Sequence, residues 1–478
     1  MPSRRPFFVF VGIALVCEEQ PACTIGVLTV EQPSSSVRVR FAPSPTGQVH
    51  IGNIRTAIFN WLFARGHGGK FLVRVEDTDR ERSTPEAIRV LFEVMEWLGL
   101  DFDEDPVYQS ACVSRHKQVA EDLIARGLAY KSDKGASGMG EAILFRMPKE
   151  DVRFTDLIKG EIAKPGDSLQ DFVIVRSDGT PVFHLANVVD DIDMGITHVI
   201  RGDDHVENTF RHIRLYQALG APLPQFGHLP MIVNHQGKPY SKRDGAAFVG
   251  EFRDTGYLPD ALFNFLSLLG WNPGDDREYM PREELVAAFD LARVQSSPAQ
   301  MDLKKLSWMN GCYMADLPIA LFREEAIRRL QAEGLVDAAT DAAYVEAVLE
   351  LIRSRVKVWP ELIELAVYFF REDYPFDAKA VRKRLLKPGV SELLDRLREG
   401  YAGLSEWSES ALDEALRSAL GADQENAGTL IHPVRVAVSG QAGGPGLFEM
   451  LQVLGRDRVL TRLERGSRIA AGTLTVGE

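Results

Sequence analysis

Two short groups of residues in this sequence have the side chains and spacing that phosphate chemistry requires. His50, Gly52 and Asn53 come directly after a loop rich in Pro and Gly and begin an amphipathic pattern, so we expect them where a helix starts. Backbone N–H groups at a helix N-terminus bind phosphate, and a glycine there lets a nucleotide approach closely. Ser241 and Lys242 come much later in the chain, and the lysine would bring positive charge to a phosphate. An isolated Ser-Lys-Arg run is more often an exposed basic loop.

The first group lies on a strand, a loop and a helix that follow one another directly. Apolar residues alternate over 37–41, the loop occupies 43–47, and apolar residues recur at helical spacing over 54–62. A second strand at 70–75 completes a βαβ unit, which predicts a parallel sheet. Such sheets bind ligands at the carboxyl ends of their strands, where the loop and Glu76 both lie. The sequence contains no GxGxxG pattern, so it does not predict the usual dinucleotide-binding fold.

Later segments indicate a second half of the same sheet, interrupted by a small insertion. The runs 172–175 and 182–185 flank an Asp-Gly turn and predict antiparallel strands. A strand over 197–201 then leads into a helix over 206–219. Beyond about residue 316 the pattern is almost wholly helical.

The composition is that of a globular protein with more than one domain. The chain has 478 residues, of which 45% are hydrophobic and 26% charged, and its net charge is −13. This charge argues weakly against a general nucleic-acid binder, but it leaves room for local basic surfaces. No apolar run reaches the roughly 18 residues that span a bilayer. The four cysteines are too scattered for a zinc knuckle, so we expect a reducing compartment and no bound metal: Cys17, Cys23, Cys112 and Cys312.

Residues 1–36 differ in character from the rest of the chain. Arg4 and Arg5 precede an apolar run from Phe7 to Val16, a pattern that resembles a secretory signal. The alternative is an unstructured extension or a start site assigned too early. We prefer that alternative, because the sequence that follows has the features of a cytosolic enzyme.

The motifs taken together resemble a known enzyme family. The pattern PSPTGxxHIGN followed by SKR is the signature pair of class I aminoacyl-tRNA synthetases in their glutamyl/glutaminyl branch, and the chain is most similar to the bacterial glutamyl-tRNA synthetases. HIGN alone would be a weak signal, but six blocks stand in the family's order. The other blocks are VRVEDTDRERS, HLANVVDDIDMGITHVIRGDDH, DLKKLSWMNG and GPGLFEML, with SKR extended to SKRDGAAF.

The resemblance implies an α/β catalytic domain followed by an all-α anticodon-binding region. The catalytic domain would be a Rossmann-like parallel sheet over residues 37–240, with a short acceptor-binding insertion at about 110–190. A region that contacts the tRNA stem would occupy 241–315, and the helical anticodon-binding region 316–478. Residues 1–36 would remain as the N-terminal extension.

The resemblance also implies the reaction and its participants. The enzyme would activate L-glutamate with ATP and Mg²⁺ to glutamyl-adenylate and transfer the glutamyl group to the 3′ end of tRNA(Glu). ATP would be a substrate rather than a resident cofactor, and no zinc is expected. The protein would be a cytoplasmic monomer without a membrane partner.

The family pattern assigns site residues position by position. His50 and Lys242 would be catalytic. Without the family pattern, Arg40 would be expected to face outward from its strand, as Arg38 does. The glutamate pocket would contain Arg40, Ala42, Ser44, Glu76, Phe183, Asn187 and Arg201, with the arginines on the carboxylates and Glu76 on the ammonium. The ATP site would contain His50, Gly52, Asn53, Asp204, Ile232, Ser241 and Lys242.

A guanidinium that pairs with a carboxylate should reject the neutral amide, because the charge would be left buried and unpaired. Such polar mismatches are worth on the order of 10⁴-fold in discrimination. This is the physical reason to expect glutamate rather than glutamine as the substrate.

Three departures from the family pattern concern the site. Phe183 stands where the family has a tyrosine, and a lost hydroxyl contact costs roughly 1–3 kcal/mol if its partner stays unsatisfied. Pro239 replaces the first lysine of the KxSK signature, with Lys238 one position earlier, and a proline stiffens a loop that relatives use as a clamp. The segment between Tyr130 and Phe145 is shorter than in relatives and has no Cys-rich knob.

Several alternatives stay open from the sequence. Arg355 falls where some relatives use an arginine to distinguish glutamate from glutamine anticodons, but a non-discriminating enzyme that also charges tRNA(Gln) remains possible. A glutaminyl enzyme would carry β-barrels where residues 316–478 indicate helices, and the truncated glutamyl-queuosine enzyme would lack that region. A tRNA-binding paralogue without catalysis is the remaining alternative.

Overall fold

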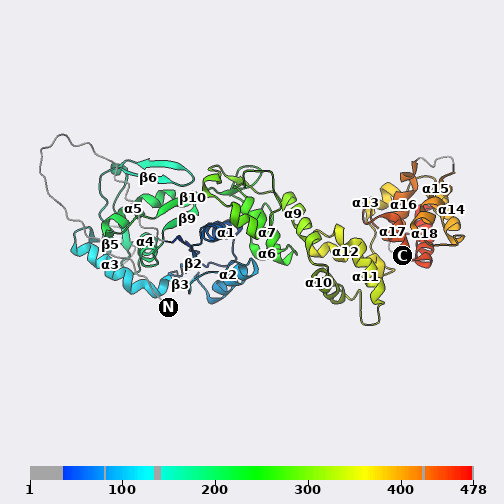
Figure 1. The fold of residues 1–478 in the computed structure, drawn as a ribbon, viewed down its shortest axis with the longest axis horizontal. Helices are drawn as coiled ribbons and strands as arrows, with labels where there is room; N and C mark the ends of the chain where they lie inside the picture. The colour runs from blue at the N-terminus through cyan, green and yellow to red at the C-terminus, as the bar shows by residue number, and fades with distance from the viewer. Residues whose placement is uncertain (1–35, 80–81, 134–140, 422–425, 476–478) are drawn as a thin grey trace, which may run out of the picture. The chain divides into compact units, whose positions relative to one another are not determined.

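The first βαβ unit forms as the residue pattern predicts. The computed structural model describes residues 36–79, 82–133, 141–421 and 426–475. Strands β1 (Arg38–Phe41) and β2 (Lys70–Val75) pair in parallel, and helix α1 (Ile51–Gly66) connects them (Figure 1). Strand β3 (Val107–Tyr108) adds to the sheet beside β2. The predicted N-terminal extension, with its signal-like run, lies outside the described residues except for Ser36.

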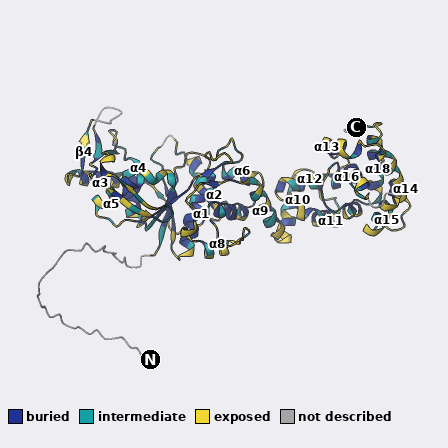
Figure 2. Ribbon diagram, turned by 90° about the horizontal axis from the view of Figure 1, so that it is seen from above, coloured by how far each residue is buried: buried dark blue, intermediate teal, exposed yellow. Residues whose placement is uncertain are grey.

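Helix α1 is the most deeply buried element of this unit. Its residues are buried along most of its length (Figure 2), and the helix contacts β1 and β2 on one side and α7 (Pro259–Leu268) on another. Its apolar residues therefore occupy more than one face, since the helix lies inside the core and not on a surface. Helix α2 (Pro85–Trp97) follows β2 and is amphipathic instead.

The second half of the sheet lies directly beside β1. Strands β9 (His198–Gly202) and β10 (Gln225–Leu229) pair in parallel, and β10 also pairs in parallel with β6 (Val152–Asp156), which forms a hairpin with β7 (Gly160–Lys164). The backbone N–H of Thr197 donates to the carbonyl oxygen of Arg38 at 2.9 Å, which joins this sheet to β1. Helix α5 (Val206–Leu219) follows β9 as predicted.

The predicted antiparallel insertion is present. Strands β4 (Ala129–Ser132), β5 (Ala142–Phe145) and β8 (Phe172–Val175) form a three-stranded antiparallel sheet. Helices α3 (Val113–Ala125) and α4 (Phe183–Asp193) pack against each other next to it. Residues of these elements share one apolar core with β9, α5 and β10.

The strand predicted over 182–185 is wrong, because helix α4 begins at Phe183. The backbone N–H of Val182 still donates to the carbonyl oxygen of Ile174 at 2.9 Å, so the hairpin pairing after the turn continues as far as Val182 and then ends. Leu185, Val188 and Val189 are then buried on one side of a helix. Four residues are too few to distinguish the alternating pattern of a strand from the 3.6-residue period of a helix. The helical period becomes visible only over the longer run 183–193.

The segment after β10 closes the α/β part of the chain. Strands β11 (Ile232–Val233) and β12 (Ala299–Gln300) form a short parallel pair. The apolar core of β1, α1 and β2 extends into this segment and includes Phe252, Phe263 and Trp271. Its helices are α6 (Val249–Asp254), α7 (Pro259–Leu268), α8 (Arg282–Ala288) and α9 (Leu303–Asp316).

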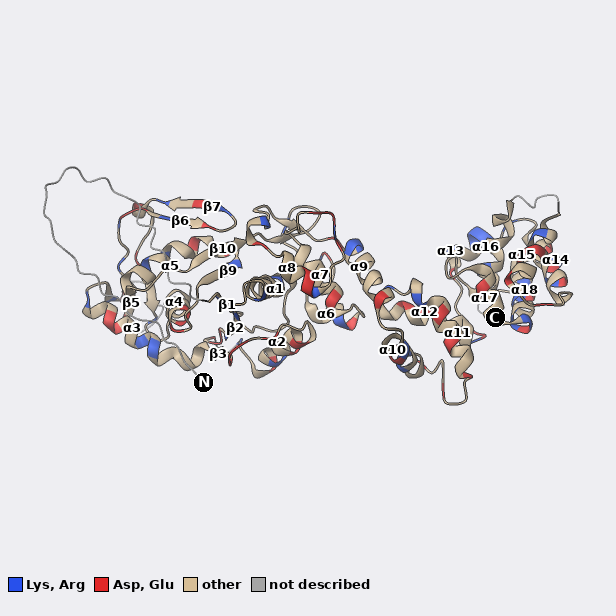
Figure 3. Cartoon of the chain, in the orientation of Figure 1, with Lys and Arg blue, Asp and Glu red and all other residues tan. Residues whose placement is uncertain are grey.

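The C-terminal part is helical, as predicted, and has a separate apolar core that runs from Met314 to Ile469. Lys, Arg, Asp and Glu residues are spread along its helices (Figure 3). None of the helices in the described ranges is long and apolar enough to cross a membrane. The main helices are α10 (Ile319–Ala332), α11 (Ala342–Ile352), α12 (Trp359–Phe370), α13 (Ala378–Ala380), α14 (Val390–Ala402), α15 (Glu409–Leu420), α16 (Gly428–Ser439), α17 (Leu447–Leu454) and α18 (Arg456–Ala470).

Candidate active site

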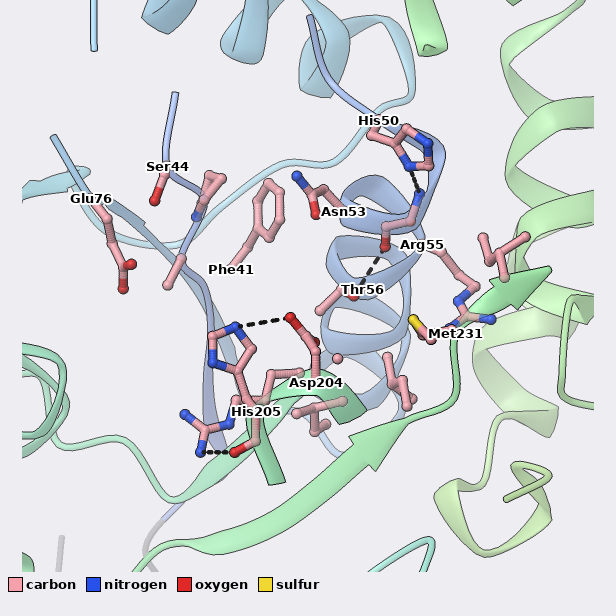
Figure 4. Close-up of a pocket in the computed structure, with 18 of the residues that line it drawn as sticks. Phe41, Ser44, His50, Asn53, Arg55, Thr56, Glu76, Asp204, His205 and Met231 are labelled. Carbon is pink, nitrogen blue, oxygen red and sulfur yellow. Dashed lines mark hydrogen bonds and ion pairs between the residues drawn. The ribbon is translucent and has the colours of Figure 1, made fainter. Parts of the chain in front are cut away.

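A cavity lies at the carboxyl ends of β1, β2 and β9, next to the N-terminus of α1 (Figure 4). Its volume is about 580 Å³. This is the position that the parallel topology predicts for a ligand. The cavity brings together twelve of the residues expected from the sequence: Arg40, Ala42, Ser44, His50, Gly52, Asn53, Glu76, Phe183, Asn187, Arg201, Asp204 and Ile232.

His50 forms the N-cap of α1. Its backbone is extended, and its Nδ1 accepts a hydrogen bond from the N–H of Gly52 at 3.1 Å. Nδ1 must therefore carry a lone pair, so the neutral ring has its proton on Nε2. Burial lowers the pKa of His50, against the opposing effect of a hydrogen bond with the backbone of Tyr240, so the neutral form is favoured. His50 thus links the helix N-terminus to the segment that carries the second signature.

Ser241 and Lys242 lie beside the cavity rather than in its wall, which is formed at that end by Pro239 and Tyr240. The carboxylate of Asp244 accepts from the backbone N–H of Ser241 at 3.0 Å and from its hydroxyl at 2.9 Å. Lys242 Nζ lies 4.4 Å from the centre of the Phe248 ring. Among the described residues, no carboxylate forms an ion pair with Lys242, so its charge is available for a ligand phosphate.

Phe248 connects the two signatures. The ring of His50 lies edge-on to Phe248 with ring centres 5.8 Å apart, and Lys242 sits over the same aromatic ring. Pro239 forms an isolated bridge with Val233, so it belongs to a short hairpin around Gly237, whose φ is 73°. The proline therefore occupies an ordered turn at the base of the signature loop, and Lys242 lies beyond it.

Arg40 is buried, which contradicts the alternative of an outward-facing strand residue. Its side chain is 3% exposed, and Nε donates to Asp191 Oδ1 at 3.0 Å. Arg38 makes a half-buried pair with the exposed Glu104 instead, at 2.7 Å. The two arginines are two residues apart on one strand but differ in exposure, because α4 supplies a carboxylate only to Arg40.

A buried network of charges behind the cavity was missed by the sequence analysis. Arg74 is fully buried, and its guanidinium contacts three carboxylates: Asp191 by a short hydrogen bond, Glu76 at 3.3 Å and Asp190 at 3.9 Å. Burial opposes the charged form, but the charges of Asp191, Glu76 and Asp190 outweigh it and raise the pKa of Arg74. A charged residue within the apolar run 71–75 was the signal that could have indicated this network.

Glu76 stands at the edge of this network and faces the cavity (Figure 4). Its Oε1 accepts from Asn187 Nδ2 at 3.0 Å and from Arg74. Burial raises the pKa of the Glu76 carboxyl, while the charges of Arg74 and Arg40 act in the opposite direction. A buried carboxylate at this position can bind a cationic group such as an ammonium.

Arg201 and Arg55 are the two buried arginines of the cavity that have no ion pair among the described residues; Arg55 donates to the backbone carbonyl groups of Leu269 and Pro230, and Arg201 lies at the other side, near Glu76 and Arg40. Arg201 is 6% exposed, and no carboxylate among the described residues lies within ion-pair distance of it. Its hydrogen bonds go to neutral groups of Thr209, His228, His212 and His205. Burial, with a smaller contribution from the charge of Arg40, lowers the pKa of Arg201 to about 9, so the group is still charged at neutral pH.

Phe183 packs among histidine rings. Its ring centre lies 5.4 Å from that of His205 and 5.6 Å from those of His184 and His212. All three imidazoles have pKa values lowered mainly by burial, that of His184 to about 4. Phe183 therefore contributes an apolar wall next to uncharged rings and has no hydroxyl with which to contact a ligand.

Arg355 lies outside the cavity, in a one-turn segment of the C-terminal part between α11 and α12. Burial lowers the pKa of Arg435 on α16, and the charge of Arg355 adds to this effect. Burial also lowers the pKa of His432, with contributions from Arg384, Arg435, Lys387 and Lys383. These electrostatic effects indicate a basic cluster around α16. Within the described part of the chain, none of its Lys or Arg residues has an ion pair. The cluster comprises Arg355, Lys383, Arg384, Lys387, His432 and Arg435.

The described residues contain no group of three or more His, Cys, Asp or Glu side chains arranged to hold a metal ion. The polar groups of the cavity are instead those that bind organic ions: guanidinium groups, a carboxylate, a histidine and helix N–H groups. The arrangement can hold an ammonium and carboxylates at one end and phosphates at the other.

Comparisons with known proteins agree with this arrangement. Residues 36–142 and 134–308 match the family described as tRNA synthetases class I (E and Q), catalytic domain, and residues 320–467 match an anticodon binding domain. Glutamate--tRNA ligase 1 of Caldanaerobacter subterraneus is 38% identical over 90% of this chain and 97% of its own length. Glutamate--tRNA ligase of Stenotrophomonas maltophilia is 42% identical over 89% of this chain and 97% of its own length.

A solved structure shows the same fold. A glutamate tRNA ligase from Elizabethkingia meningosepticum, in complex with its amino acid, aligns with a TM-score of 0.79 and 28% identity. The alignment covers 91% of this chain and 99% of that chain. The similarity therefore includes both the α/β part and the helical part.

The network around Asp191 predicts a large loss of stability on its removal. Asp191→Ala leaves Arg40 and Arg74 without their shared carboxylate, and breaking such a buried pair costs roughly 3–5 kcal/mol. Urea unfolding followed by circular dichroism measures the change. Glu104→Ala is the matched control, since each of its solvent-accessible pairs, with Arg38 and with Lys70, should contribute only about 0.2–1 kcal/mol. Equal effects of the two substitutions would contradict the structural role given to the network.

Proposed function

Because this chain belongs to the class I glutamate–tRNA ligases, we propose that its cavity binds L-glutamate and ATP side by side and forms glutamyl-adenylate there. The glutamyl group is then transferred to the 3′ end of tRNA(Glu). One observation carries the assignment of the amino-acid end: the same cavity holds Arg201, a buried cation without an acidic partner, and Glu76, a buried carboxylate. These two groups are complementary to the carboxylate and the ammonium of an amino acid.

Glutamate differs from most amino acids by a second carboxylate, and the cavity offers a second guanidinium. Arg40 is held by Asp191 through Nε, which leaves its Nη groups for a ligand. Ser44 and Asn187 add neutral polar groups to the same wall. Glutamine would leave one guanidinium without a charge partner, and a mismatch of that kind costs on the order of 10⁴-fold in specificity.

ATP occupies the other end, at the N-terminus of α1. His50, Gly52 and Asn53 line this end of the cavity, where the positive end of α1 faces the triphosphate. Asp204 and Ile232 line the side where we place the ribose and the base. Mg²⁺ arrives with ATP and reduces the charge of the phosphates.

The chemistry is an in-line displacement at phosphorus. An α-carboxylate oxygen of glutamate attacks the α-phosphorus, the bond to the bridging oxygen breaks, and pyrophosphate leaves with the electron pair. Lys242 and the positive end of α1, which His50 caps, stabilise the extra negative charge on the phosphate oxygens. The 2′-hydroxyl of the terminal adenosine then attacks the carbonyl carbon, loses its proton and displaces AMP.

We place tRNA on the basic cluster of the C-terminal part as well as at the cavity. The cluster contains unpaired cations within a chain of net charge −13, so it is a local exception to the overall charge. Phosphate contacts of this kind position a nucleic acid without reading its sequence. Arg355, at the edge of the cluster, is our candidate for anticodon discrimination. The protein would act as a cytoplasmic monomer.

Aminoacylation tests the assignment directly. The purified protein, with ATP and Mg²⁺, should attach labelled glutamate to tRNA(Glu) and should not attach glutamine. The same assay with tRNA(Gln) separates a discriminating enzyme, which leaves it uncharged, from a non-discriminating one. Failure to charge any tRNA would favour the non-catalytic paralogue.

Lys242 should act on the transition state more than on the bound substrates. Lys242→Ala is expected to lower kcat by about 10²-fold with little change in KM for glutamate, because its charge is needed when the phosphate oxygens gain charge. Steady-state aminoacylation gives both constants. Lys70→Ala, at the amino end of β2 and paired with Glu104, should leave both unchanged. A rise in KM without a fall in kcat would make Lys242 a ground-state ligand.

The basic cluster should contribute electrostatically to tRNA binding. Replacing Lys383 and Lys387 with Ala should weaken binding of tRNA(Glu) and reduce the slope of log affinity against log salt, by roughly 0.7 for each lost contact with a single-stranded phosphate. Filter binding at several salt concentrations measures this slope. Arg417→Ala, which removes a residue already paired with Asp413, serves as the control and should leave the slope unchanged.

A further inference from the structure

The guanidinium of Arg201 is oriented by groups that carry no negative charge of their own. Nη2 donates to the Thr209 hydroxyl at 2.7 Å and to the backbone carbonyl of His205 at 3.3 Å. Nε donates to His228 Nε2 and Nη1 to His212 Nδ1, both at 3.3 Å. The arrangement differs from that of Arg40, which is held by the carboxylate of Asp191.

The contact with Arg201 fixes the proton position on His228. An arginine Nε always carries a hydrogen and can only donate, so His228 Nε2 must offer a lone pair. The single proton of the neutral imidazole is therefore on Nδ1. Nδ1 lies 2.5 Å from Asp156 Oδ2 and donates to it. The Thr209 hydroxyl also lies 3.0 Å from Nε2, and a proton on Nε2 would face the N–H of Arg201.

Asp156 is in turn fixed by the backbone. It is the last residue of β6, and its Oδ1 accepts from the N–H groups of Ile158 at 3.0 Å, Lys159 at 2.9 Å and His228 at 3.2 Å. Burial opposes its ionisation, but the hydrogen bonds from His228 and from these amides lower the pKa of Asp156 overall. Its two oxygens therefore have separate tasks: Oδ1 holds the backbone and Oδ2 holds the imidazole.

A second chain of neutral histidines supports the other side of the guanidinium. His212 Nδ1 must accept from Arg201, so the proton of this ring is on Nε2, which lies 3.2 Å from His184 Nδ1. His184 accepts that hydrogen bond and is also uncharged, since burial lowers its pKa to about 4. Both arms thus present lone pairs to Arg201 and no carboxylate.

We propose that Asp156 and His228, neither of which lines the cavity, are positioning residues that orient Arg201 for a substrate carboxylate while leaving its charge uncompensated. Asp156 selects the tautomer of His228, and that tautomer presents an acceptor to Arg201. A carboxylate in direct contact would hold the guanidinium equally well, but it would compete with the substrate for the charge. This inference rests on the proposed role of Arg201 in binding glutamate.

The chain of contacts from Asp156 through His228 to Arg201 is a relay. Asp156→Asn tests this relay because the substitution replaces one carboxylate oxygen, an acceptor, by an NH₂ group, a donor, and hardly changes the volume of the side chain. The three backbone N–H groups keep the amide oxygen in the place of Oδ1, so the NH₂ group faces His228 Nδ1. Nδ1 must then accept and the proton moves to Nε2, where it can donate to the Thr209 hydroxyl, so Arg201 Nε loses its acceptor. A hydrogen bond to a charged group is worth roughly 1.5–3 kcal/mol.

The expected result is a rise in KM for glutamate of about 10- to 100-fold in ATP–pyrophosphate exchange with tRNA(Glu) present, with KM for ATP unchanged. NMR of the full chain labelled with ¹⁵N-histidine should show the proton of His228 moving from Nδ1 to Nε2. Asp151→Asn is the matched control, since Asp151 precedes the same strand and accepts from the Gly166 N–H at 3.1 Å. It should leave both constants and the tautomer unchanged.

Arg201→Gln separates this inference from the proposed function. If Arg201→Gln does not raise KM for glutamate, the proposed role of Arg201 is wrong. If it does, and Asp156→Asn leaves KM for glutamate and the tautomer as in the wild type, only the relay is wrong. An equal rise in KM for ATP and for glutamate in Asp156→Asn would also overturn the relay, because it would indicate general damage to the fold.

A second pair of variants serves if Asp156→Asn does not fold. His228→Gln keeps an oxygen acceptor near Arg201, whereas His228→Leu removes the acceptor with a side chain of similar size. The relay predicts a larger KM for glutamate in His228→Leu than in His228→Gln. Equal values for the two variants would overturn it.

Discussion

The site depends on burying four guanidinium groups in one small region without losing their charge: those of Arg40, Arg55, Arg74 and Arg201. Arg40 and Arg74 share the carboxylate of Asp191, which α4 places behind the sheet, and Arg74 also contacts Glu76 and Asp190. Isolated buried charges are costly, so this pairing is what allows arginines to stand at the ends of β1 and β2. Arg201 is stabilised differently, by neutral acceptors only. The cavity consequently keeps a positive charge that a ligand can use.

The phosphate end follows from the connection of one strand to one helix. β1 ends, a short loop turns, and α1 begins at the cap residue His50, so the helix N–H groups face the same cavity as the ends of β1, β2 and β9. α1 is surrounded by the core, which fixes its direction. Because Phe248 contacts both His50 and Lys242, the two signatures are joined through one aromatic ring although they are far apart in sequence.

The departures from the family pattern take different forms in the structure. Pro239 lies in an ordered hairpin, where its fixed φ is compatible with the turn, and Lys242 lies beyond it. Phe183 packs against three neutral histidines, so the missing hydroxyl leaves an apolar wall. The shortened insertion still forms an antiparallel sheet of β4, β5 and β8, although residues 134–140 lie outside the described ranges.

Sequence alone determined the βαβ unit, the helical C-terminal part and twelve residues that line the cavity, because the strand and helix periods and the motifs are local. It misread residues 182–185, where four residues could not separate a strand from a helix start. Arg74, Asp191, Asp156 and His228 emerged only from the tertiary structure. Their roles depend on which carboxylate or imidazole reaches which guanidinium, and that is set by packing between segments distant in the chain.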